Sequence, residues 1–567
     1  MTSCTSLPGD GERPAAVRST LKNQIRHPLL VLLFYSFLFA SFFSPALFSN
    51  HLLAPGDGLI YYLPNFYAAR DFWDPLILSG FPRIADSQVM TWYPPAVAFS
   101  VFSFWPNAWN LFVISAYILA SCFAYGYTYS LTGSRLASLV SGIVYGMSGI
   151  MVAHLGHVTI IHTAVWLPLI LWSLETGRRA PHTGSHTWWF AVGTISVACA
   201  ALAGHPQILL YILVLAAAYV LLCGWTEARM PWRYFGLSLL MVFLGLGLAA
   251  IQLLPTMELT GLTPRVQFSF ADFVSYSLPL RQVPTLLLPL IFGGAPESFY
   301  GQPYFGAWPA PVGGWGPGEP TAYVGLLPIM LAIIGVVAWT KKRVTFFWSV
   351  VAMFAFVLTL GDATSLAALT YRLPAINRFR APSRHFIEMA FAISVLSGLG
   401  VAAIKQAPVT KRLLQRSILI VAGFFLVCLV AVYLMSDRLH ELAAGRGIND
   451  LKLLPWTNPA IGVPIAVLLT TAGILIYWYR SPNSYARSAL LLLILVLDLA
   501  SFSWFGEWRD KSAQKDLLSP PTFASRYKNI LDTHHQRMLP VRGSLGTVNE
   551  IIPNLSRLWN VPSASGY

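Results

Sequence analysis

The chain has 567 residues, of which 56% are hydrophobic and 11% charged, and its formal net charge is +14. Soluble domains carry about 25% charged residues, so this composition excludes an ordinary soluble protein and predicts an integral membrane protein. Basic loops in contact with anionic lipid headgroups explain the positive charge without nucleic acid as a partner.

Apolar runs recur along the chain at lengths that suit a bilayer. About 20 apolar residues in a helix cross a hydrocarbon core of about 30 Å. Such runs begin near residues 29, 107, 136, 158, 188, 207, 234, 321, 345, 385, 413, 460 and 487. The sequence therefore predicts an all-α polytopic membrane protein, a bundle of about thirteen transmembrane helices.

The distribution of basic residues predicts the topology. The first apolar run, 29–48, is longer than a signal-peptide core, so we interpret it as an uncleaved signal anchor. With a cytoplasmic N-terminus, every predicted inner loop is basic, as the positive-inside rule requires; these residues are Arg135, Arg178, Arg179, Arg229, Arg233, Lys341, Lys342, Arg343, Lys405, Lys411, Arg412, Arg416, Arg480 and Arg487. We expect a cytoplasmic polar tail at 1–27, a transmembrane domain at 28–505 and an outer C-terminal segment at 506–567.

Three predicted outer segments are long, namely 50–95, 255–320 and 361–384. Loops longer than about fifteen residues are usually functional or disordered, and these are too aromatic for disorder. The aromatic residues of the first segment suit short interfacial helices at the headgroup level; they are Tyr61, Tyr62, Trp73, Trp92 and Tyr93. The chemistry is therefore expected on the outer face.

The first outer segment carries the acidic candidates. Asp57 lies between two glycines, so its backbone can turn sharply and present the carboxylate near the membrane surface. Such a carboxylate can act as a general base toward a hydroxyl group; the alternative is a turn-forming aspartate. Asp86 is the second catalytic candidate, as a metal or phosphate-side ligand or as a positioning group. Asp71 and Asp74 are expected to pair with Arg70 or to face solvent.

Basic residues are scarce in the predicted outer segments, with one exception. Arg378, Arg380 and Arg384 precede the span that begins near residue 385. Guanidinium groups bind phosphate in a bidentate manner, so this cluster is a candidate site for a lipid phosphate. The alternatives are interfacial snorkelling and an ion pair between Arg384 and Glu388.

Polar residues also gather at the outer mouths of two spans. His205 and Gln207 open the sixth predicted span, where they could hydrogen-bond a sugar or pyrophosphate oxygen or form a helix start. His154, His157 and His162 surround the start of the fourth span. They could ligate a metal, but no carboxylate clusters with them in the sequence.

Several of these motifs together resemble a known family. They are the Gly56-Asp57 turn with Tyr61, Trp92-Tyr93-Pro94-Pro95, Gly204-His205-Pro206-Gln207, and the segment from Arg378 to Arg384. In order and sidedness, and over nearly the whole chain, they resemble the bacterial YfhO-type membrane proteins of the wider GT-C glycosyltransferase group. Members of that family commonly carry a larger outer C-terminal portion than 506–567.

The resemblance implies a GT-C-like fold in the bacterial inner membrane, a polyprenyl-phosphate sugar donor and an envelope acceptor. It also implies a catalytic acid in the first outer loop, which corresponds to Asp57. The residues expected to bind the substrates are then Tyr61, His205, Gln207, Arg378, Arg380 and Arg384. A divalent cation, the donor sugar and the acceptor are left open.

Two classes of function fit these features. The first is a glycosyltransferase that moves a sugar to a cell-envelope polymer, lipid or protein on the outer face of the membrane. The second is a flippase or transporter of lipid-linked sugars, or another non-enzymatic envelope protein. A transporter would want polar residues along a path through the bilayer. Asp498, Glu388 and Glu258 are few and lie near span ends, which favours the enzyme.

Overall fold

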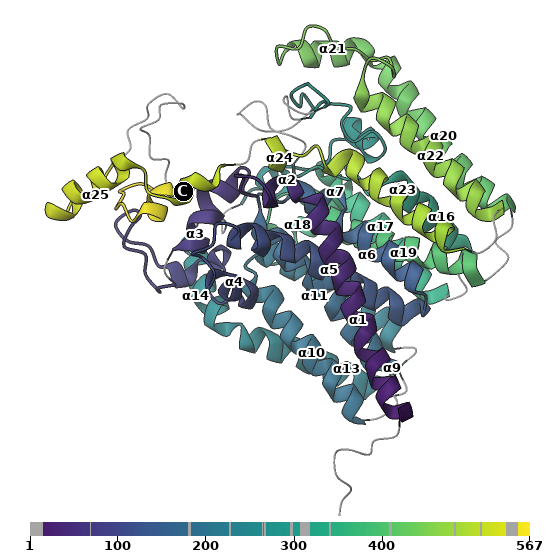
Figure 1. The fold of residues 1–567 in the computed structure, drawn as a ribbon, viewed down its shortest axis with the longest axis horizontal. Coiled ribbons are helices and arrows are strands. Elements are labelled where there is room, and N and C mark those ends of the chain that lie inside the picture. Colours follow the sequence, from purple (N-terminus) through teal and green to yellow (C-terminus); the bar gives the residue numbers. More distant parts are fainter. Residues whose placement is uncertain are drawn as a thin grey trace, which may run out of the picture.

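The described part of the chain is helical. The computed structural model describes residues 15–68, 70–179, 183–225, 228, 230–263, 265, 268–294, 299–306, 318–338, 342–406, 411–480, 484–510, 513–539 and 554–566. Within these ranges, extended pairing is confined to isolated bridges such as that between His51 and Gln514, and all other regular structure is helix (Figure 1). The all-α prediction is confirmed.

The longer helices form the bundle in Figure 1. They are α1 (Ala15–Phe42), α5 (Ala108–Thr132), α6 (Arg135–Gly146), α9 (Trp166–Arg179), α10 (Thr183–Leu202), α11 (Pro206–Tyr219), α13 (Pro231–Leu248), α14 (Ala250–Thr260), α16 (Leu326–Ala338), α17 (Lys342–Thr359), α19 (Phe386–Gln406), α20 (Lys411–Leu434), α22 (Pro459–Arg480) and α23 (Tyr485–Ser503). The shorter helices are α2 (Ser44–Leu47), α3 (Leu63–Tyr67), α4 (Pro94–Ser100), α7 (Gly149–Ala153), α8 (Val158–Ala164), α15 (Phe270–Val274), α18 (Ser365–Tyr371), α21 (Ser436–Ala444), α24 (Glu507–Asp510) and α25 (Thr522–Thr533).

Nine helical segments of the described chain are long and apolar enough to cross a membrane. They are Ala108–Thr132, Arg135–Ala153, Val158–Arg179, Pro206–Gly224, Pro231–Leu248, Pro382–Ile404, Lys411–Leu434, Pro459–Arg480 and Tyr485–Ser503. The other predicted spans coincide with shorter apolar helices at His27–Phe42, Thr187–Leu202, Leu326–Ala338 and Arg343–Thr359. At about 1.5 Å per residue these shorter helices extend roughly 20 to 26 Å. The chain is a multi-pass membrane protein, and the total of about thirteen spans stays a prediction.

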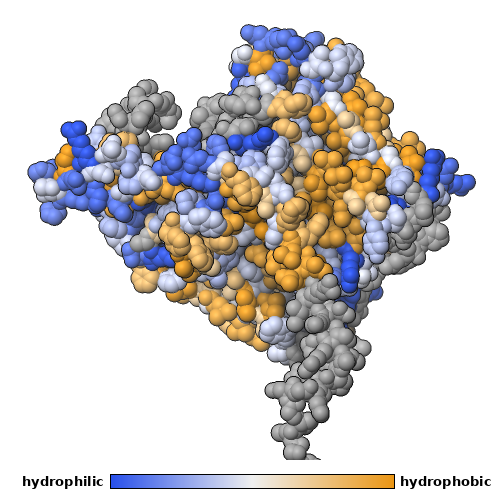
Figure 2. Space-filling view, in the orientation of Figure 1, coloured by the Kyte–Doolittle hydropathy of each residue, from blue (hydrophilic) through white to orange (hydrophobic). Residues whose placement is uncertain are grey.

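The bundle has a buried centre and an apolar periphery. The segment Arg135–Ala153 is 89% buried, whereas Pro231–Leu248 and Lys411–Leu434 are only 22% and 28% buried. Large apolar side chains on these peripheral helices are exposed, for example Phe243 (74%) and Leu434 (83%). Apolar area in water costs about 25 cal/mol per Å², so such a surface requires lipid. Figure 2 shows this apolar surface over the bundle and hydrophilic surface over α21 and α25.

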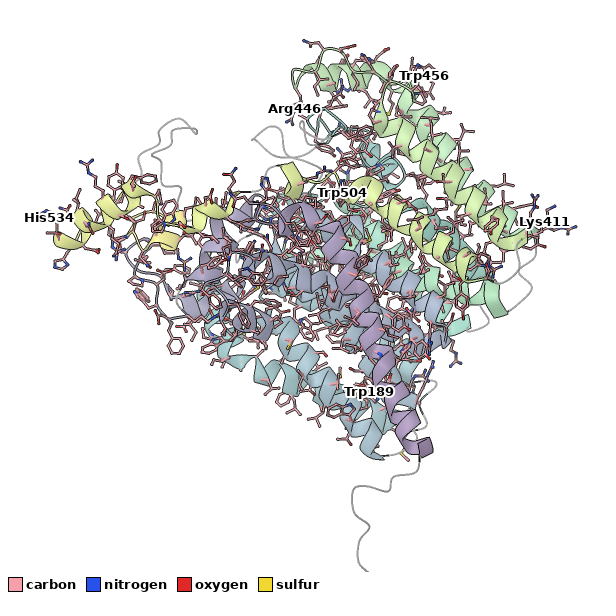
Figure 3. All side chains as sticks on the ribbon, viewed as in Figure 1. Trp189, Lys411, Arg446, Trp456, Trp504 and His534 are labelled. Carbon is pink, nitrogen blue, oxygen red and sulfur yellow. The ribbon has the colours of Figure 1, made fainter. Side chains whose placement is uncertain are left out.

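The peripheral pair α20 and α22 shows how the two membrane boundaries differ. Figure 3 places Lys411 at one end of this pair and Arg446 and Trp456 at the opposite end. Lys411 belongs to a predicted inner loop, and Trp456 is 79% exposed, as expected for an aromatic residue at the headgroup level. The segment 435–458, with α21, is thus a further long outer segment on the predicted topology. The orientation itself stays a prediction.

The chain after α23 returns to the first outer segment. The Lys515 amide donates to the Asn50 carbonyl at 2.7 Å, and the Ser563 amide donates to the Leu76 carbonyl at 2.7 Å. In Figure 1 this yellow segment lies beside α3 and includes the projecting helix α25, and its C-terminal end lies near α3. The predicted outer C-terminal segment is therefore in contact with the loop that contains Asp57.

The prediction that the aromatic residues of the first outer segment lie at the headgroup level is only partly right. Trp73 is 54% exposed, but Tyr62 and Tyr93 are buried, with exposed fractions of only 3% and 0%. The Tyr93 ring packs edge-on against the His162 ring, and its hydroxyl lies 3.2 Å from Nδ1 of that histidine. These two tyrosines belong to the core because the loop folds back between helices.

Candidate active site

Asp57 lies on a tight turn that follows α2. Gly56 has φ +54°, in the left-handed region that favours glycine, and the Gly58 amide donates to the Pro55 carbonyl at 3.0 Å. The Asp57 side chain is 34% exposed, and its Oδ2 lies 3.3 Å from Nε2 of His157. The turn therefore presents an accessible carboxylate beside an imidazole.

The connection between α7 and α8 carries His154 and His157. A Cβ atom on Gly156 would lie 2.5 Å from the Pro55 carbonyl oxygen, so only glycine lets this connection approach the Asp57 turn. His154 is 1% exposed; its Nδ1 lies 2.9 Å from the Ile150 carbonyl, and its Nε2 lies 3.0 Å from Glu319 Oε2. Both ring nitrogens lie within hydrogen-bond distance of an oxygen atom, so the ring of His154 is held in one orientation between α7 and Glu319.

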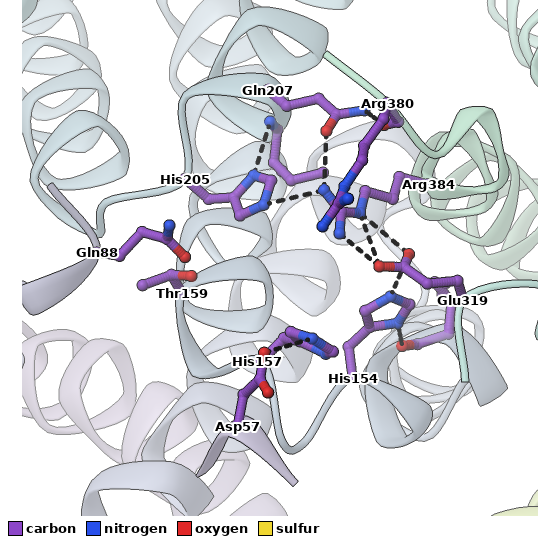
Figure 4. A network of polar contacts seen from close by, with 12 residues as sticks. Asp57, Gln88, His154, His157, Thr159, His205, Gln207, Glu319, Arg380 and Arg384 are labelled. Atoms are coloured by element: carbon purple, nitrogen blue, oxygen red, sulfur yellow. Dashed lines mark hydrogen bonds and ion pairs between the residues drawn. The ribbon is translucent and has the colours of Figure 1, made fainter. Parts of the chain in front are cut away.

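Glu319 lies between Arg384 and His154 (Figure 4). It is 6% exposed and receives hydrogen bonds from His154 and from Nε and Nη2 of Arg384. Burial by itself would raise the pKa of Glu319, but the Arg384 guanidinium and His154 hold it well below its usual range. Glu319 is therefore a carboxylate that fixes the orientation of both partners.

Arg384 links this carboxylate to the start of α11. Its Nη1 donates to Gln207 Oε1 at 2.9 Å and lies 3.4 Å from His205 Nε2. The side-chain amide of Gln207 donates through Nε2 to the Arg380 backbone carbonyl at 2.7 Å. His205 caps α11, because its Nδ1 accepts from the Ile208 amide at 3.3 Å. A helix start and a contact with Arg384 are thus combined in the same two side chains.

His205 is held neutral by its surroundings. Burial and then the nearby Arg384 charge lower the pKa of His205 well below its usual value. Gly204 before it has φ +89°, and a Cβ there would lie 2.1 Å from the Ser87 carbonyl oxygen. This glycine brings the first outer segment against the start of α11.

Three guanidinium groups surround this part of the site. Arg380 is exposed, with its guanidinium carbon 5.4 Å from the centre of the Tyr276 ring. Burial, and then repulsion from Arg380 and Arg384, lower the pKa of Arg265. Glu319 is already committed to Arg384 and His154, so positive potential is left around Arg265 and Arg380.

Asp86 forms a separate group in the first outer segment. Its carboxylate accepts from the Tyr61 hydroxyl and from the Gln88 amide at 3.1 Å. Gln88 in turn accepts from the Tyr62 hydroxyl at 2.9 Å, and this hydroxyl lies 3.0 Å from Thr159 Oγ1. Burial raises the pKa of Asp86 despite the Tyr61 hydrogen bond. These contacts suit a group that positions the loop.

The expected surroundings of Asp74 are corrected. Asp74 is 5% exposed and forms an ion pair with Arg557, which also donates to Asn65 Oδ1 at 2.6 Å. Asn65 then donates to the Tyr61 carbonyl at 2.9 Å. Arg70 instead donates to backbone carbonyl groups of the same segment. The partner of Asp74 comes from the C-terminal segment, nearly 500 residues away, and no local pattern could indicate it.

The structure brings several predicted site residues together and leaves others apart. Asp57 meets His157, and Arg384 meets His205 and Gln207 in the network of Figure 4. Arg378 is exposed and contributes nothing to this network. An ion pair between Arg384 and Glu388 does not form; Glu388 pairs with His385 instead. Arg384 is 12% exposed, so it is not a freely solvated interfacial arginine.

Sequence reasoning missed Glu319 and Arg265. Glu319 follows a Gly- and Pro-rich stretch and has no helical periodicity to place it, and its partners lie 65 and 165 residues away. Arg265 lacked any neighbouring motif. The histidines were noticed for metal binding, but within the described residues no group of three His, Cys, Asp or Glu side chains could hold a metal ion. His162 is stacked on Phe112 with ring centres 4.2 Å apart.

A buried hydrogen-bond partner explains why the acidic residue Asp498 lies within α23. Its carboxylate accepts from the Tyr323 hydroxyl at 2.5 Å and from the Leu327 amide at 2.7 Å. It thereby caps α16 from a distant helix. The segment between Glu319 and α16 is anchored by this contact, so Asp498 supports the site indirectly.

Comparison with known proteins identifies the fold. No family model matches the chain, and no curated protein matches its sequence. The solved structure of the arabinofuranosyltransferase AftD from mycobacteria is similar, with a TM-score of 0.50 and 13% identity over 96% of this chain and 32% of AftD. ArnT from Cupriavidus metallidurans, in the apo state, has a TM-score of 0.50 and 13% identity over 94% of this chain and 84% of ArnT.

The chain therefore has the GT-C membrane fold, as predicted. It spans about a third of the length of AftD, 32%. An identity of 13% shows the fold alone. The finer resemblance to YfhO-type proteins stays a prediction.

Proposed function

We propose that this chain is a membrane glycosyltransferase that moves a sugar from a polyprenyl-phosphate donor to an acceptor hydroxyl on the outer face of the bacterial inner membrane. The shared fold with AftD, an arabinofuranosyltransferase, supports the reaction class. The observation that carries the proposal is the juxtaposition of an accessible Asp57 carboxylate and an arginine-rich network at the ends of helices (Figure 4).

Asp57 acts as the general base in this proposal. Its carboxylate accepts the proton of the acceptor hydroxyl while the acceptor oxygen bonds to the anomeric carbon. The bond from this carbon to the donor phosphate oxygen breaks, and its electron pair leaves with the phosphate. His157, 3.3 Å from Asp57 Oδ2, holds the carboxylate in one orientation. A single displacement of this kind inverts the configuration at the anomeric carbon.

The arginines stabilise the departing phosphate. Arg380 is exposed and can approach the donor directly, and Arg265 adds positive potential beside it. Arg384 is neutralised by Glu319, so its contribution is to orient Gln207 and His205 toward the sugar or phosphate oxygens. This division of roles replaces the simpler expectation of three equivalent phosphate ligands.

The residues of the first outer segment have secondary roles in this proposal. Tyr61 donates its hydroxyl to Asp86, so both side chains shape the loop that lines the acceptor side. Asp86 becomes the base only if Asp57 is shown to be dispensable. No step above depends on a divalent cation, which the sequence leaves open.

A flippase of lipid-linked sugars remains the alternative function. It requires a polar route through the bilayer, whereas the network that motivates the proposal lies at helix ends. A flippase would change the side of the membrane on which the lipid-linked sugar is found. A transferase would leave the sugar attached to an envelope acceptor.

The test compares cells that lack the gene with cells that carry wild type, Asp57→Asn or Asp71→Asn. Asn keeps the size of the side chain but cannot accept the proton, and general base catalysis contributes about 10² to 10⁴ in rate. Asp71 is an exposed aspartate of the same segment and serves as the matched control. Mass spectrometry of envelope polymers and polyprenyl lipids should show loss of one glycosylated product with Asp57→Asn alone. Full product formation by Asp57→Asn, or retained anomeric configuration, would remove Asp57 from the mechanism.

A further inference from the structure

An apolar groove lies away from the candidate active site, between the outer segment 280–292 and the end of α20 with α21. Ile291 and Phe292 line one wall, and Val432 and Leu439 line the other. The space between the walls is about 550 Å³, including its opening to solvent. The enclosed part of this space is about 90 Å³, so the groove can hold a segment of an acyl chain while the rest of the chain stays in the bilayer.

The groove lies where α20 leaves the predicted membrane span. The span Lys411–Leu434 ends immediately before α21. On its outer surface Leu426 is 59% exposed and Leu434 is 83% exposed, so this helix faces lipid. In Figure 1 the teal outer segment lies beneath α21 at this end of α20. An apolar groove at this height is within reach of the acyl chains of the bilayer.

Two arginines border the groove, one from each wall. Arg281 is exposed, and no ion pair formed among the described residues includes it. Arg438 pairs with Glu441 at 2.8 Å, but both side chains are about two-thirds exposed, at 64% and 65%. An exposed pair of this kind contributes only about 0 to 1 kcal/mol, so a phosphate can compete for the guanidinium.

We propose that this groove binds one anionic phospholipid of the surrounding bilayer. The phosphate lies between Arg281 and Arg438, which can make charge-assisted hydrogen bonds to it. One acyl chain lies between Phe292 and Leu439. No residue that lines the groove belongs to the network around Asp57 and Arg384, so this lipid is distinct from a sugar donor.

Such a lipid would hold the outer segment against α20. The segment begins beside the candidate site, where Tyr276 contacts the Arg380 guanidinium and the Leu278 amide donates to the Thr359 carbonyl at 2.8 Å. It then continues to Arg281 at the groove. A bound phospholipid would therefore add a further contact between two elements that already pack against each other.

The experiment is native mass spectrometry of the purified full chain after exchange into mixed micelles with phosphatidylglycerol. Wild type should retain one phosphatidylglycerol, and Arg281→Ala with Arg438→Ala should reduce the retained fraction about tenfold or more, because each charged hydrogen bond is strong. Val432→Trp should have a similar effect by filling the groove while both arginines remain. The matched control is Arg446→Ala with Lys452→Ala, which removes two exposed cations near α21 but outside the groove. A variant is included in the comparison when its melting temperature matches that of wild type.

Four results would overturn the proposal. Equal retention of zwitterionic phosphatidylcholine would show that the arginines do not select the lipid. Displacement of the lipid by inorganic phosphate at the same concentration would show that the apolar walls do not contribute. Preferential binding of undecaprenyl phosphate would assign the groove to a different lipid. Unchanged retention in the arginine and tryptophan variants would place the lipid elsewhere. None of these measurements requires glycosyl transfer, so they are independent of the proposed function.

Discussion

Replacing Glu319 by Gln tests whether the network at the candidate active site is a buried ionic unit. The substitution keeps the shape of the side chain and removes its charge. Arg384, with a side chain only 12% exposed, then has no counter-charge beside its guanidinium. Glu319→Gln should therefore destabilise the protein rather than merely alter its activity.

The expected magnitude follows from the burial of the partners. Removing one member of a buried ion pair costs about 3 to 5 kcal/mol, because a desolvated charge is left uncompensated. Arg384→Gln should cost a similar amount, since Glu319 loses its main partner. The double variant removes both charges together, so it should cost less than the two single variants added. A coupling energy of about 1 to 3 kcal/mol is expected for residues in direct contact.

The assay is reversible unfolding of the purified full chain in detergent, measured for wild type, both single variants and the double variant. The matched control is Arg438→Gln and Glu441→Gln on α21, an ion pair with side chains 64% and 65% exposed. Solvent screens this control pair, so its coupling energy should be below about 1 kcal/mol. Additive costs at Glu319 and Arg384, or a coupling no larger than in the control, would refute the argument that this pair is buried and mutually dependent.

Three further predictions concern donor binding, pH and topology. Arg380→Ala should weaken binding of undecaprenyl phosphate about tenfold, whereas Arg378→Ala, outside the network, should have little effect; equal losses would make the cluster merely interfacial. The pKa of His205 is lowered in the folded state, so the unfolded state binds a proton first as the pH falls. The free energy of unfolding should therefore decrease below about pH 6.5, by at most about 1.4 kcal/mol per pH unit. His205→Asn keeps the helix cap but cannot titrate, so its stability should depend less on pH between 7.5 and 5, and identical slopes would contradict the prediction. Ser79→Cys and Ser525→Cys, both at exposed positions, should be labelled from the same side of the membrane by an impermeant thiol reagent; opposite accessibility would mean that the number of spans between them is odd.

The sequence by itself determined the fold class, because membrane insertion depends on local composition. A hydrocarbon core selects any sufficiently long apolar run, and the predicted starts of the spans coincide with apolar helices. The turn at Asp57 and the start of α11 at His205 and Gln207 could also be predicted from the sequence, because glycine, proline and capping side chains act within a few residues. These features need no knowledge of distant contacts.

Only the tertiary structure decided the partners of the charged residues. Glu319 joins His154 and Arg384, and Asp74 pairs with Arg557, across separations that local patterns do not encode. A charge in a low-dielectric environment is stabilised only by a counter-charge within a few ångströms, and helix packing alone determines which charges meet. The same packing places Arg384, which was expected at a wet boundary, in an ion pair with Glu319 with only 12% of its side chain exposed.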